Sequence, residues 1–241
     1  MRKYKCFFLA LTAVAFSTAV VAADTLLLAA GAGYRKPVLE LMQNFSQASG
    51  IKAEASFGNM KQIETQAQQN PDIAFLIGDR VFLEPMQMFE RYLPLGQGRL
   101  VLVAARGQSM VSLNELREPR FKRIALPDRT KAVYGKAAAT CLQRLGLEQP
   151  LAGKLLEVAT VPQVSTYVAT GEVDAGFVNL TEALALGDRV GTRVDAPASC
   201  YDPIEISIGV LKGRGESAGA RAFVDYLASP AARSVLERHG L

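Results

Sequence analysis

The chain has 241 residues, of which 49% are hydrophobic, and its 27 basic and 23 acidic residues give a formal net charge of +4. This apolar content supports real hydrophobic cores, which excludes a mainly disordered chain, and the length suits one large domain or two lobes of roughly 100 residues each. The sequence contains a single His, which argues against Ser–His–Asp and Cys–His catalysis and excludes a His-rich metal site.

The first 23 residues have the pattern of a secretory signal peptide. Three basic residues among the first five precede a short apolar stretch at 7–16, and small residues at 19–23 follow. The apolar stretch is shorter than the about 20 residues that a membrane-spanning helix needs. We therefore predict cleavage after Ala22 or Ala23 and export to the periplasm, with an uncleaved N-terminal anchor as the alternative.

The predicted signal peptide also accounts for most of the net charge. It contains three basic residues and no acidic residue, so the rest of the chain carries 24 basic and 23 acidic residues. A nearly neutral chain has no general electrostatic attraction for phosphate backbones. We therefore expect no nucleic-acid partner.

After the signal peptide, segments with strand and helix patterns alternate. The first strand pattern is a continuous apolar run, and Pro37 lies where the first turn of the following helix is expected. The predicted strands are 25–30, 51–57 and 73–77, and the predicted helices are 37–49 and 61–69. This alternation predicts an α/β fold with a parallel sheet and helices on its faces.

A second series of the same kind follows, and after its first strand it contains a capping box formed by Ser112 and Glu115. The predicted strands are 100–104, 124–126, 157–161, 175–178 and 204–211, and the predicted helices are 133–145, 163–170, 181–186, 217–227 and 230–239. No low-complexity linker separates the two series. We therefore expect two closely tied lobes.

Short turns rich in small and polar residues lie between several of these strands and the helices that follow them. The turns are Gly31-Ala32-Gly33, Gly58-Asn59-Met60, Lys131-Ala132-Val133, Thr160-Val161-Pro162 and Val178-Asn179. Ligands of open α/β sheets bind at the carboxyl ends of the strands, where free N–H groups and the helix dipole favour an anion. The pattern predicts a site for a small anion, although turn geometry alone can require such residues.

Motifs for other chemistry are weak or absent from the sequence. The segment 31–36 resembles the opening of a dinucleotide-binding fingerprint, but Lys36 stands where the third glycine belongs. No P-loop, CxxC or HExxH motif occurs. We therefore expect no cofactor and no metal centre.

Two cysteines follow the predicted signal peptide, Cys141 and Cys200. An even number of cysteines in an oxidising compartment favours a disulfide. Two buried free thiols are the alternative.

Several stretches resemble the periplasmic molybdate-binding proteins of ABC importers, which are two-lobed solute-binding proteins. The resemblance extends over essentially the whole chain after the signal peptide. It is carried by LLLAAGAG (26–33), FSQASGIKAEASFGN (45–59), RLVLVAARG (99–107), FKRIALPD (121–128), YVATGEVDAGFVNLTEAL (167–184) and YDPIEISIGVLKGRGESAGARAFVDYLASPAARSVLERHGL (201–241).

The resemblance implies two α/β lobes, each with a mostly parallel sheet, joined by crossing hinge strands that let the lobes close on a ligand. Lobe one is expected at 24–98 plus 203–241 and lobe two at 99–202, with crossings near 99–103 and 203–211. If the disulfide forms, Cys200 near the return crossing is tied to Cys141 in lobe two.

The family holds a tetrahedral dianion with two Ser hydroxyls, a Tyr hydroxyl and backbone N–H groups. Matched onto this sequence, the first Ser falls at Ala32 or Gly33, the second near Asn59 or Met60, and the Tyr at Asn179. The backbone donors fall near Ala132 and Val161. None of the family's hydroxyl side chains is therefore retained, and only Asn59 and Asn179 offer side-chain amide donors in their place. Tyr34, Lys61, Lys131 and Tyr134 lie close by in the sequence and could substitute.

The resemblance implies an exported, monomeric receptor that captures a small oxyanion, with molybdate or tungstate favoured, and delivers it to an ABC permease in the inner membrane. The changed contact residues leave phosphate, sulfate, a small organic anion or a sensor role as alternatives. A secreted enzyme is a third possibility, which the lack of any His-containing constellation argues against.

Overall fold

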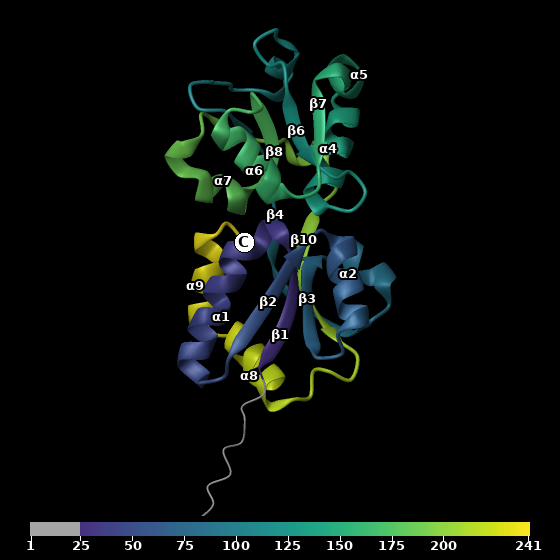
Figure 1. The fold of residues 1–241 in the computed structure, drawn as a ribbon, viewed down its shortest axis with the longest axis vertical. Coiled ribbons are helices and arrows are strands. Elements are labelled where there is room, and N and C mark those ends of the chain that lie inside the picture. The colour runs from purple at the N-terminus through teal and green to yellow at the C-terminus, as the bar shows by residue number, and fades with distance from the viewer. Residues whose placement is uncertain (1–24) are drawn as a thin grey trace, which may run out of the picture.

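A computed structural model describes residues 25–241, which form two α/β lobes stacked along the long axis of the molecule (Figure 1). The predicted signal peptide lies outside the described residues. Within residues 25–241, no helix combines the length and the apolar character that a membrane span requires.

The first lobe is built on a five-stranded sheet with the order β2-β1-β3-β10-β4. Strands β1, β2 and β3 are parallel, as the alternating pattern predicted, and β10 runs antiparallel to both β3 and β4. The elements are β1 (Leu26–Gly31), η1 (Ala32–Tyr34), α1 (Arg35–Ser49), β2 (Ala53–Gly58), α2 (Met60–Gln69), β3 (Ile73–Asp79), α3 (Arg80–Leu83), η2 (Glu84–Met86), β4 (Phe89–Gly98), β10 (Ile204–Leu211), α8 (Ala218–Leu227) and α9 (Pro230–Arg238).

The second lobe repeats this plan with the sheet order β7-β6-β8-β5-β9. Strands β6, β7 and β8 are parallel, and β5 runs antiparallel to β8 and β9. The elements are β5 (Leu100–Ala104), η3 (Leu113–Arg117), β6 (Ile124–Pro127), α4 (Val133–Arg144), α5 (Glu148–Leu151), η4 (Ala152–Lys154), β7 (Leu155–Val158), α6 (Val161–Thr170), β8 (Ala175–Asn179), α7 (Leu180–Leu186), η5 (Gly187–Arg189), β9 (Arg193–Asp195) and η6 (Ala198–Cys200).

The continuous apolar runs in the sequence correspond to strands that are buried on both faces. All five residues of β5 are buried, and so are all seven residues of β3. Helices cover these faces, with α1 packed along α9 and α6 packed against β6 and β8. One connected core extends through both lobes, and a small separate cluster of Leu41, Ala232, Val235 and Leu236 lies between α1 and α9.

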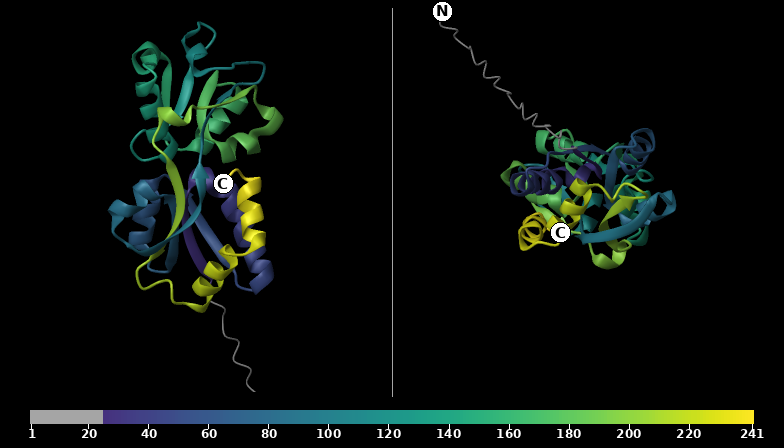
Figure 2. Two further views of the ribbon diagram at one scale, coloured as in Figure 1. Left: turned by 180° about the vertical axis from the view of Figure 1, so that it is seen from behind. Right: turned by 90° about the horizontal axis from the view of Figure 1, so that it is seen from below.

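The chain passes between the lobes twice, as Figure 2 shows from behind. Strand β4 ends at Gly98 in the first sheet, and β5 begins at Leu100 in the second sheet. The return passes from η6 to β10, through residues 201–203. The two crossings lie side by side because β4 pairs with β10 along its length.

Strands β4 and β7 differ most from the sequence prediction, and the short elements α3, α5 and β9 were not predicted either. The ten-residue strand β4 was not predicted at all. The strand placed at 157–161 is β7 at Leu155–Val158, and Val161 is already the first residue of α6. The predicted end of the strand was therefore wrong. Proline favours the first turn of a helix, and Pro162 lies in the first turn of α6, so the helix begins earlier than predicted.

A disulfide joins Cys141 on α4 to Cys200 on η6, across 59 residues of sequence. Both side chains are buried. The bridge ties the helix that begins at the inter-lobe cleft to the segment that leads into the return crossing.

Candidate functional site

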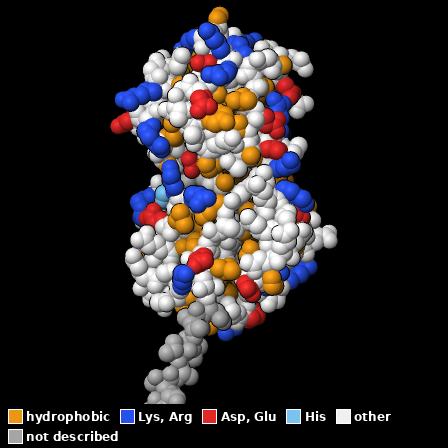
Figure 3. All heavy atoms as spheres, viewed as in Figure 1, with side chains coloured by type: hydrophobic (Ala, Val, Ile, Leu, Met, Phe, Trp, Pro, Cys, Tyr) orange, Lys and Arg blue, Asp and Glu red, His pale blue; other side chains and the backbone are white. Residues whose placement is uncertain are grey.

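A cavity of about 30 Å³ lies between the two lobes, where the molecule narrows (Figure 3). A single buried water needs about 10–15 Å³, so the cavity has room for a small ion. Its lining comes from both lobes and consists of Gly31, Ala32, Gly33, Tyr34, Gly58, Asn59, Met60, Ala132, Val133, Tyr134, Thr160 and Val161. None of these side chains carries a charge at neutral pH.

Four helices begin at this cavity, and three of them have no side-chain cap. These are the helix that starts with η1 and continues as α1, α4 after Ala132, and α6 after Thr160. In contrast, Ser217 and Ser229 cap α8 and α9 with their hydroxyl oxygens. The first N–H groups of a helix have no partner within it, so three sets of backbone donors remain available at the cavity.

The fourth helix, α2, begins with a capping box that orients Asn59. The Asn59 side-chain oxygen accepts a hydrogen bond from the backbone N–H of Gln62 at 3.0 Å, and the Gln62 side chain accepts from the Asn59 N–H at 2.8 Å. Because the amide oxygen is engaged in the cap, the NH₂ group is the part of Asn59 that is left for a ligand. The capped Asn59 therefore adds a neutral donor to the lining.

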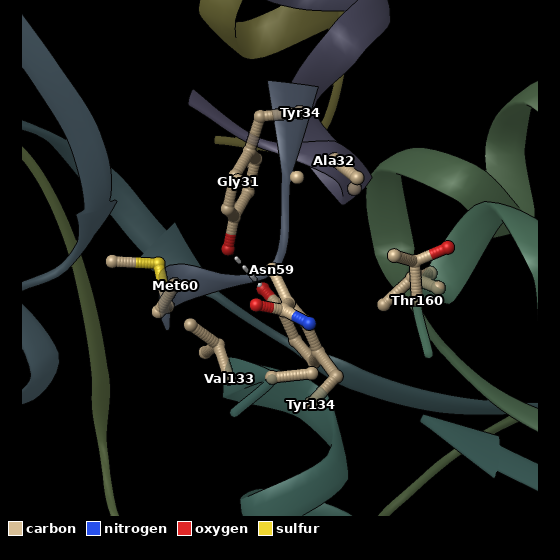
Figure 4. Close-up of a pocket in the computed structure, with 12 residues that line it drawn as sticks. Gly31, Ala32, Tyr34, Asn59, Met60, Val133, Tyr134 and Thr160 are labelled. Atoms are coloured by element: carbon tan, nitrogen blue, oxygen red, sulfur yellow. Dashed lines mark hydrogen bonds between the residues drawn. The ribbon is translucent and has the colours of Figure 1, made fainter. Parts of the chain in front are cut away.

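Two tyrosines meet across the cavity, as Figure 4 shows. The hydroxyls of Tyr34 in the first lobe and Tyr134 in the second lobe lie 2.8 Å apart and share a hydrogen bond. Burial raises the pKa of both hydroxyls above the ordinary tyrosine value, so both keep their protons at neutral pH. One proton is used between the two oxygens, and the other is free to be donated.

Two glycines allow Tyr134 and its helix to take these positions. A Cβ at Gly135 would collide with the backbone carbonyls of Pro127 and Asp128 at the end of β6. A Cβ at Gly98, in the first hinge crossing, would collide with the Tyr134 hydroxyl. The start of α4 is therefore packed directly against the strand end and the hinge.

Further contacts hold the lobes together around the cavity. The backbone N–H of Met60 donates to the Lys131 carbonyl at 2.8 Å, so this N–H is not available to a ligand. At the outer edge of the cleft, the Thr181 hydroxyl donates to the His239 carbonyl at 3.0 Å. The lobes are thus in a closed arrangement in this structure.

Asn179 lies behind the cavity rather than in its lining. Its side chain is fully buried, its NH₂ group donates to the Gly33 carbonyl at 3.0 Å, and its oxygen accepts from the Glu182 N–H at 3.2 Å. Asn179 therefore links the lobes and caps α7. It supports the turn at Gly33 instead of facing the space for a ligand.

The two candidate lysines also lie outside the cavity. Lys61 forms an ion pair with Glu64 at 2.8 Å, and Lys131 lies 3.6 Å from Asp128. Both lysines are more than half exposed and line surface grooves beside the cleft. The cavity itself is uncharged, and the described residues contain no cluster of potential metal ligands.

Most of the residues predicted from the sequence come together at the cavity. They are Ala32, Gly33, Tyr34, Asn59, Met60, Ala132, Tyr134 and Val161, whereas Asn179, Lys61 and Lys131 lie outside it. Gly31, Gly58, Val133 and Thr160 also line the cavity; they were predicted to lie in the strand-to-helix turns but not to be among the ligand contacts. All four belong to the strand-to-helix turns, so the turn pattern was the signal that could have found them.

A family model for bacterial extracellular solute-binding proteins matches residues 26–241. The chain belongs to this family. It is 29% identical over 220 residues to the molybdate-binding protein ModA of Azotobacter vinelandii, covering 88% of this chain and 87% of that protein. It is 26% identical over 225 residues to ModA of Rhodobacter capsulatus, covering 91% and 88%. The resemblance to molybdate-binding proteins is thereby confirmed.

The fold is confirmed by solved structures. The periplasmic molybdate-binding protein of Azotobacter vinelandii superposes with a TM-score of 0.82 at 22% identity, covering 89% of this chain and 97% of that one. That likeness supports the two-lobed α/β architecture. The solute-binding role of the chain rests on the family match.

Proposed function

We propose that this protein is a periplasmic receptor that captures a small oxyanion between its lobes, with molybdate or tungstate favoured, and delivers it to an ABC importer. The observation that carries the proposal is the uncharged inter-lobe cavity at which three uncapped helices begin. Partial positive charge at helix N-termini and unpaired N–H groups bind anions without a cationic side chain. The two molybdate-binding relatives support the choice of ligand class.

The balance of donors and acceptors supports an anion that carries no proton. The amide oxygens of Asn59 and Asn179 are both occupied by backbone N–H groups. The Tyr34 and Tyr134 hydroxyls keep their protons, because burial raises the pKa of each. A lining rich in donors suits molybdate, tungstate or sulfate, whereas hydrogen phosphate would also need an acceptor for its own proton.

The tyrosine pair supplies the hydroxyls that the family's Ser and Tyr positions lack in this sequence. In the closed state one hydroxyl donates to the other, which leaves the second proton for an anion in the cavity. With an anion present, both hydroxyls can turn toward its oxygens, one from each lobe. An anion that bridges the lobes in this way favours closure, because it binds the closed form better than the open form.

Delivery to a permease requires only capture and release, so the proposal contains no chemical step. Closure surrounds the anion with donors from both lobes, and opening at the two crossings releases it. The predicted signal peptide supports a location outside the cytoplasm. The proposed partners are the oxyanion and an inner-membrane permease, with the receptor acting as a monomer.

A thermal-shift panel tests the ligand class directly. Purified protein is mixed with molybdate, tungstate, sulfate, phosphate or small carboxylates, and a ligand at 100 times its Kd should add about 2.7 kcal/mol to the unfolding free energy. We expect the largest shift with molybdate or tungstate and the smallest with phosphate. A shift with a carboxylate alone would favour an organic anion, and no shift with any oxyanion would contradict the proposal.

A further inference from the structure

A second cavity, of about 40 Å³, lies between the lobes beside the return crossing. It shares Val133 with the first cavity. Unlike the first, it is lined by charged side chains, which are those of Asp79, Lys136 and Asp202. The remaining lining residues are Val81, Ala137, Thr140, Pro203 and Ile204.

Asp79 is the buried acid of this second cavity. It is the last residue of β3 and the N-cap of α3, and only 5% of its surface is exposed. Its carboxylate accepts a long hydrogen bond of 3.5 Å from the Val81 N–H. Burial raises the pKa of Asp79 to about 6, and the backbone N–H groups of Val81 and Glu205 offset only part of that effect.

The charged and titratable groups around Asp79 do not neutralise it by contact. Lys136 on α4 acts on it through space, and the Lys136 ammonium lies 5.5 Å above the ring of Phe82. Arg80, the next residue in the chain, is engaged by Glu84 at 2.7 Å and by Glu205 at 3.4 Å. The other groups that face this region are Tyr34, Tyr134, Glu205 and Asp202.

The lobes must be closed for Asp79 to be buried in this way. Val133, Lys136, Ala137 and Thr140, which cover the cavity, belong to α4 of the second lobe, whereas Asp79 belongs to the first. Opening the cleft would return the carboxylate to water. Closure on a dianion in the neighbouring cavity would add negative charge near the same carboxylate.

We propose that Asp79 makes oxyanion capture proton-linked, so that closing the lobes over the anion takes up a proton on this carboxyl. The inference rests on the proposed function and adds a residue that neither the lining of the first cavity nor the family resemblance assigned to ligand capture. Asp79 acts through its charge at the lobe interface, and it does not touch the anion.

The sign and size of the effect follow from linkage. The pKa of Asp79 is about 6 in the closed state, and an exposed Asp has a pKa of about 3.9. The closed state therefore holds more protons between these values, and affinity falls as the pH rises through 6. Between pH 5.5 and pH 8 we expect the Kd to rise about fourfold, with little further change at higher pH.

Isothermal titration calorimetry with molybdate tests the inference on three proteins. We expect the wild type to lose about fourfold in affinity from pH 5.5 to pH 8 and to take up protons at pH 5.5, measured in buffers of different ionisation enthalpy. Asp79→Asn keeps an N-cap side chain on α3 and should remove both effects relative to the wild type. The matched control, Asp202→Asn, changes an exposed carboxylate of the same cavity and should keep both.

Each outcome separates the inference from the proposed function. A pH profile that Asp79→Asn leaves unchanged, or wild-type binding without proton uptake at pH 5.5, would overturn the inference alone. Protonation of molybdate itself affects all three proteins equally, so it cancels in the comparison. Failure of all three proteins to bind any oxyanion at any pH would overturn the proposed function, and the inference with it.

Discussion

The two cavities between the lobes differ in the kind of polar group that they bury. The first presents backbone N–H groups, an amide and two protonated hydroxyls, and it contains no formal charge. The second, on the hinge side of Val133, contains two carboxylates and an ammonium group. In both cavities, residues of α4 lie opposite residues of the first lobe.

With these two linings, closure of the lobes can both surround an anion and bury a carboxylate. The neutral donors of the first cavity can surround an anion without adding a titratable charge next to it. A carboxylate placed beside the ligand space instead makes the same motion sensitive to pH. The comparison predicts that changes at the first cavity alter affinity strongly, whereas changes elsewhere at the interface alter it little or only through pH.

The largest expected effect comes from placing a charge in the neutral cavity. Asn59→Asp keeps the cap on α2, because Asp and Asn are equally good N-caps. Two charges 4 Å apart repel by about 4 kcal/mol at an effective dielectric constant of about 20. We therefore expect oxyanion affinity to fall at least about 100-fold in calorimetry.

The control for this change is Asn59→Ser, which keeps a capping oxygen and adds no charge. It should lose much less affinity, and both variants should unfold at temperatures close to that of the wild type. Retention of wild-type affinity by Asn59→Asp would mean that Asn59 lies away from the anion.

A smaller loss is expected when one backbone donor is removed. Val133 is the first residue of α4 and follows Ala132, whose backbone is extended, so proline fits this position without breaking the helix. A hydrogen bond to a charged group contributes about 1.5–3 kcal/mol, so Val133→Pro should weaken oxyanion binding about 10- to 100-fold in calorimetry.

The matched control is Ala218→Pro, at the first position of α8, far from the cavity and after an extended Ser217. It should bind the oxyanion as the wild type does. Equal losses in the two proline variants would show that the effect is on folding and not on the N–H donor.

A more modest effect is expected from the tyrosine pair. Tyr34→Phe and Tyr134→Phe each remove one hydroxyl and the bond between the lobes, and a net loss of about 1 kcal/mol corresponds to about fivefold in affinity. Because the two hydroxyls share one bond, the double variant should lose less than the sum of the single losses.

Binding assays on the two single variants and the double variant form a double-mutant cycle. Tyr92→Phe, on β4, is the control and should bind normally. Strictly additive losses would mean that the two hydroxyls act independently and that the bond between them contributes nothing to capture.

The smallest effect on affinity is expected from the disulfide. The double variant Cys141→Ser, Cys200→Ser should lose about 2–4 kcal/mol of unfolding free energy in denaturant titrations, as expected for a long closed loop. Its oxyanion affinity should stay within about twofold of the wild type, because neither residue lines the cavity. A large loss of affinity in a folded double variant would show that the bridge positions the start of α4.

Local sequence patterns predicted most of the strands and helices, because their apolar residues are buried within short segments. Strand β4 escaped prediction since Pro94, Gly96 and Gly98 are typical of a loop. The strand exists because β10 pairs with it across more than one hundred residues of sequence. Its position at the edge of the sheet tolerates the proline.

The site was predictable to the extent that it consists of turns. Small residues after buried strands marked the helix N-termini that now meet at the cavity. Tertiary packing decided the rest: Tyr34 and Tyr134 are 100 residues apart, and no local pattern pairs their hydroxyls. For the same reason, the sequence could not indicate that the amide of Asn179 would be bonded to the Gly33 carbonyl.

The bridge between α4 and η6 joins the helix that begins at the cavity to the segment that leads into the return crossing. Cys141 is fixed to the segment that ends at Cys200, so bending of the return crossing is confined to the residues that follow it. Residues 133 to 141 span about 12 Å at about 1.5 Å per residue. A rotation of the second lobe by one degree about a point near Cys141 would therefore move the start of α4 by about 0.2 Å. A small bend at the crossing would in this way displace the residues of α4 that line the cavity.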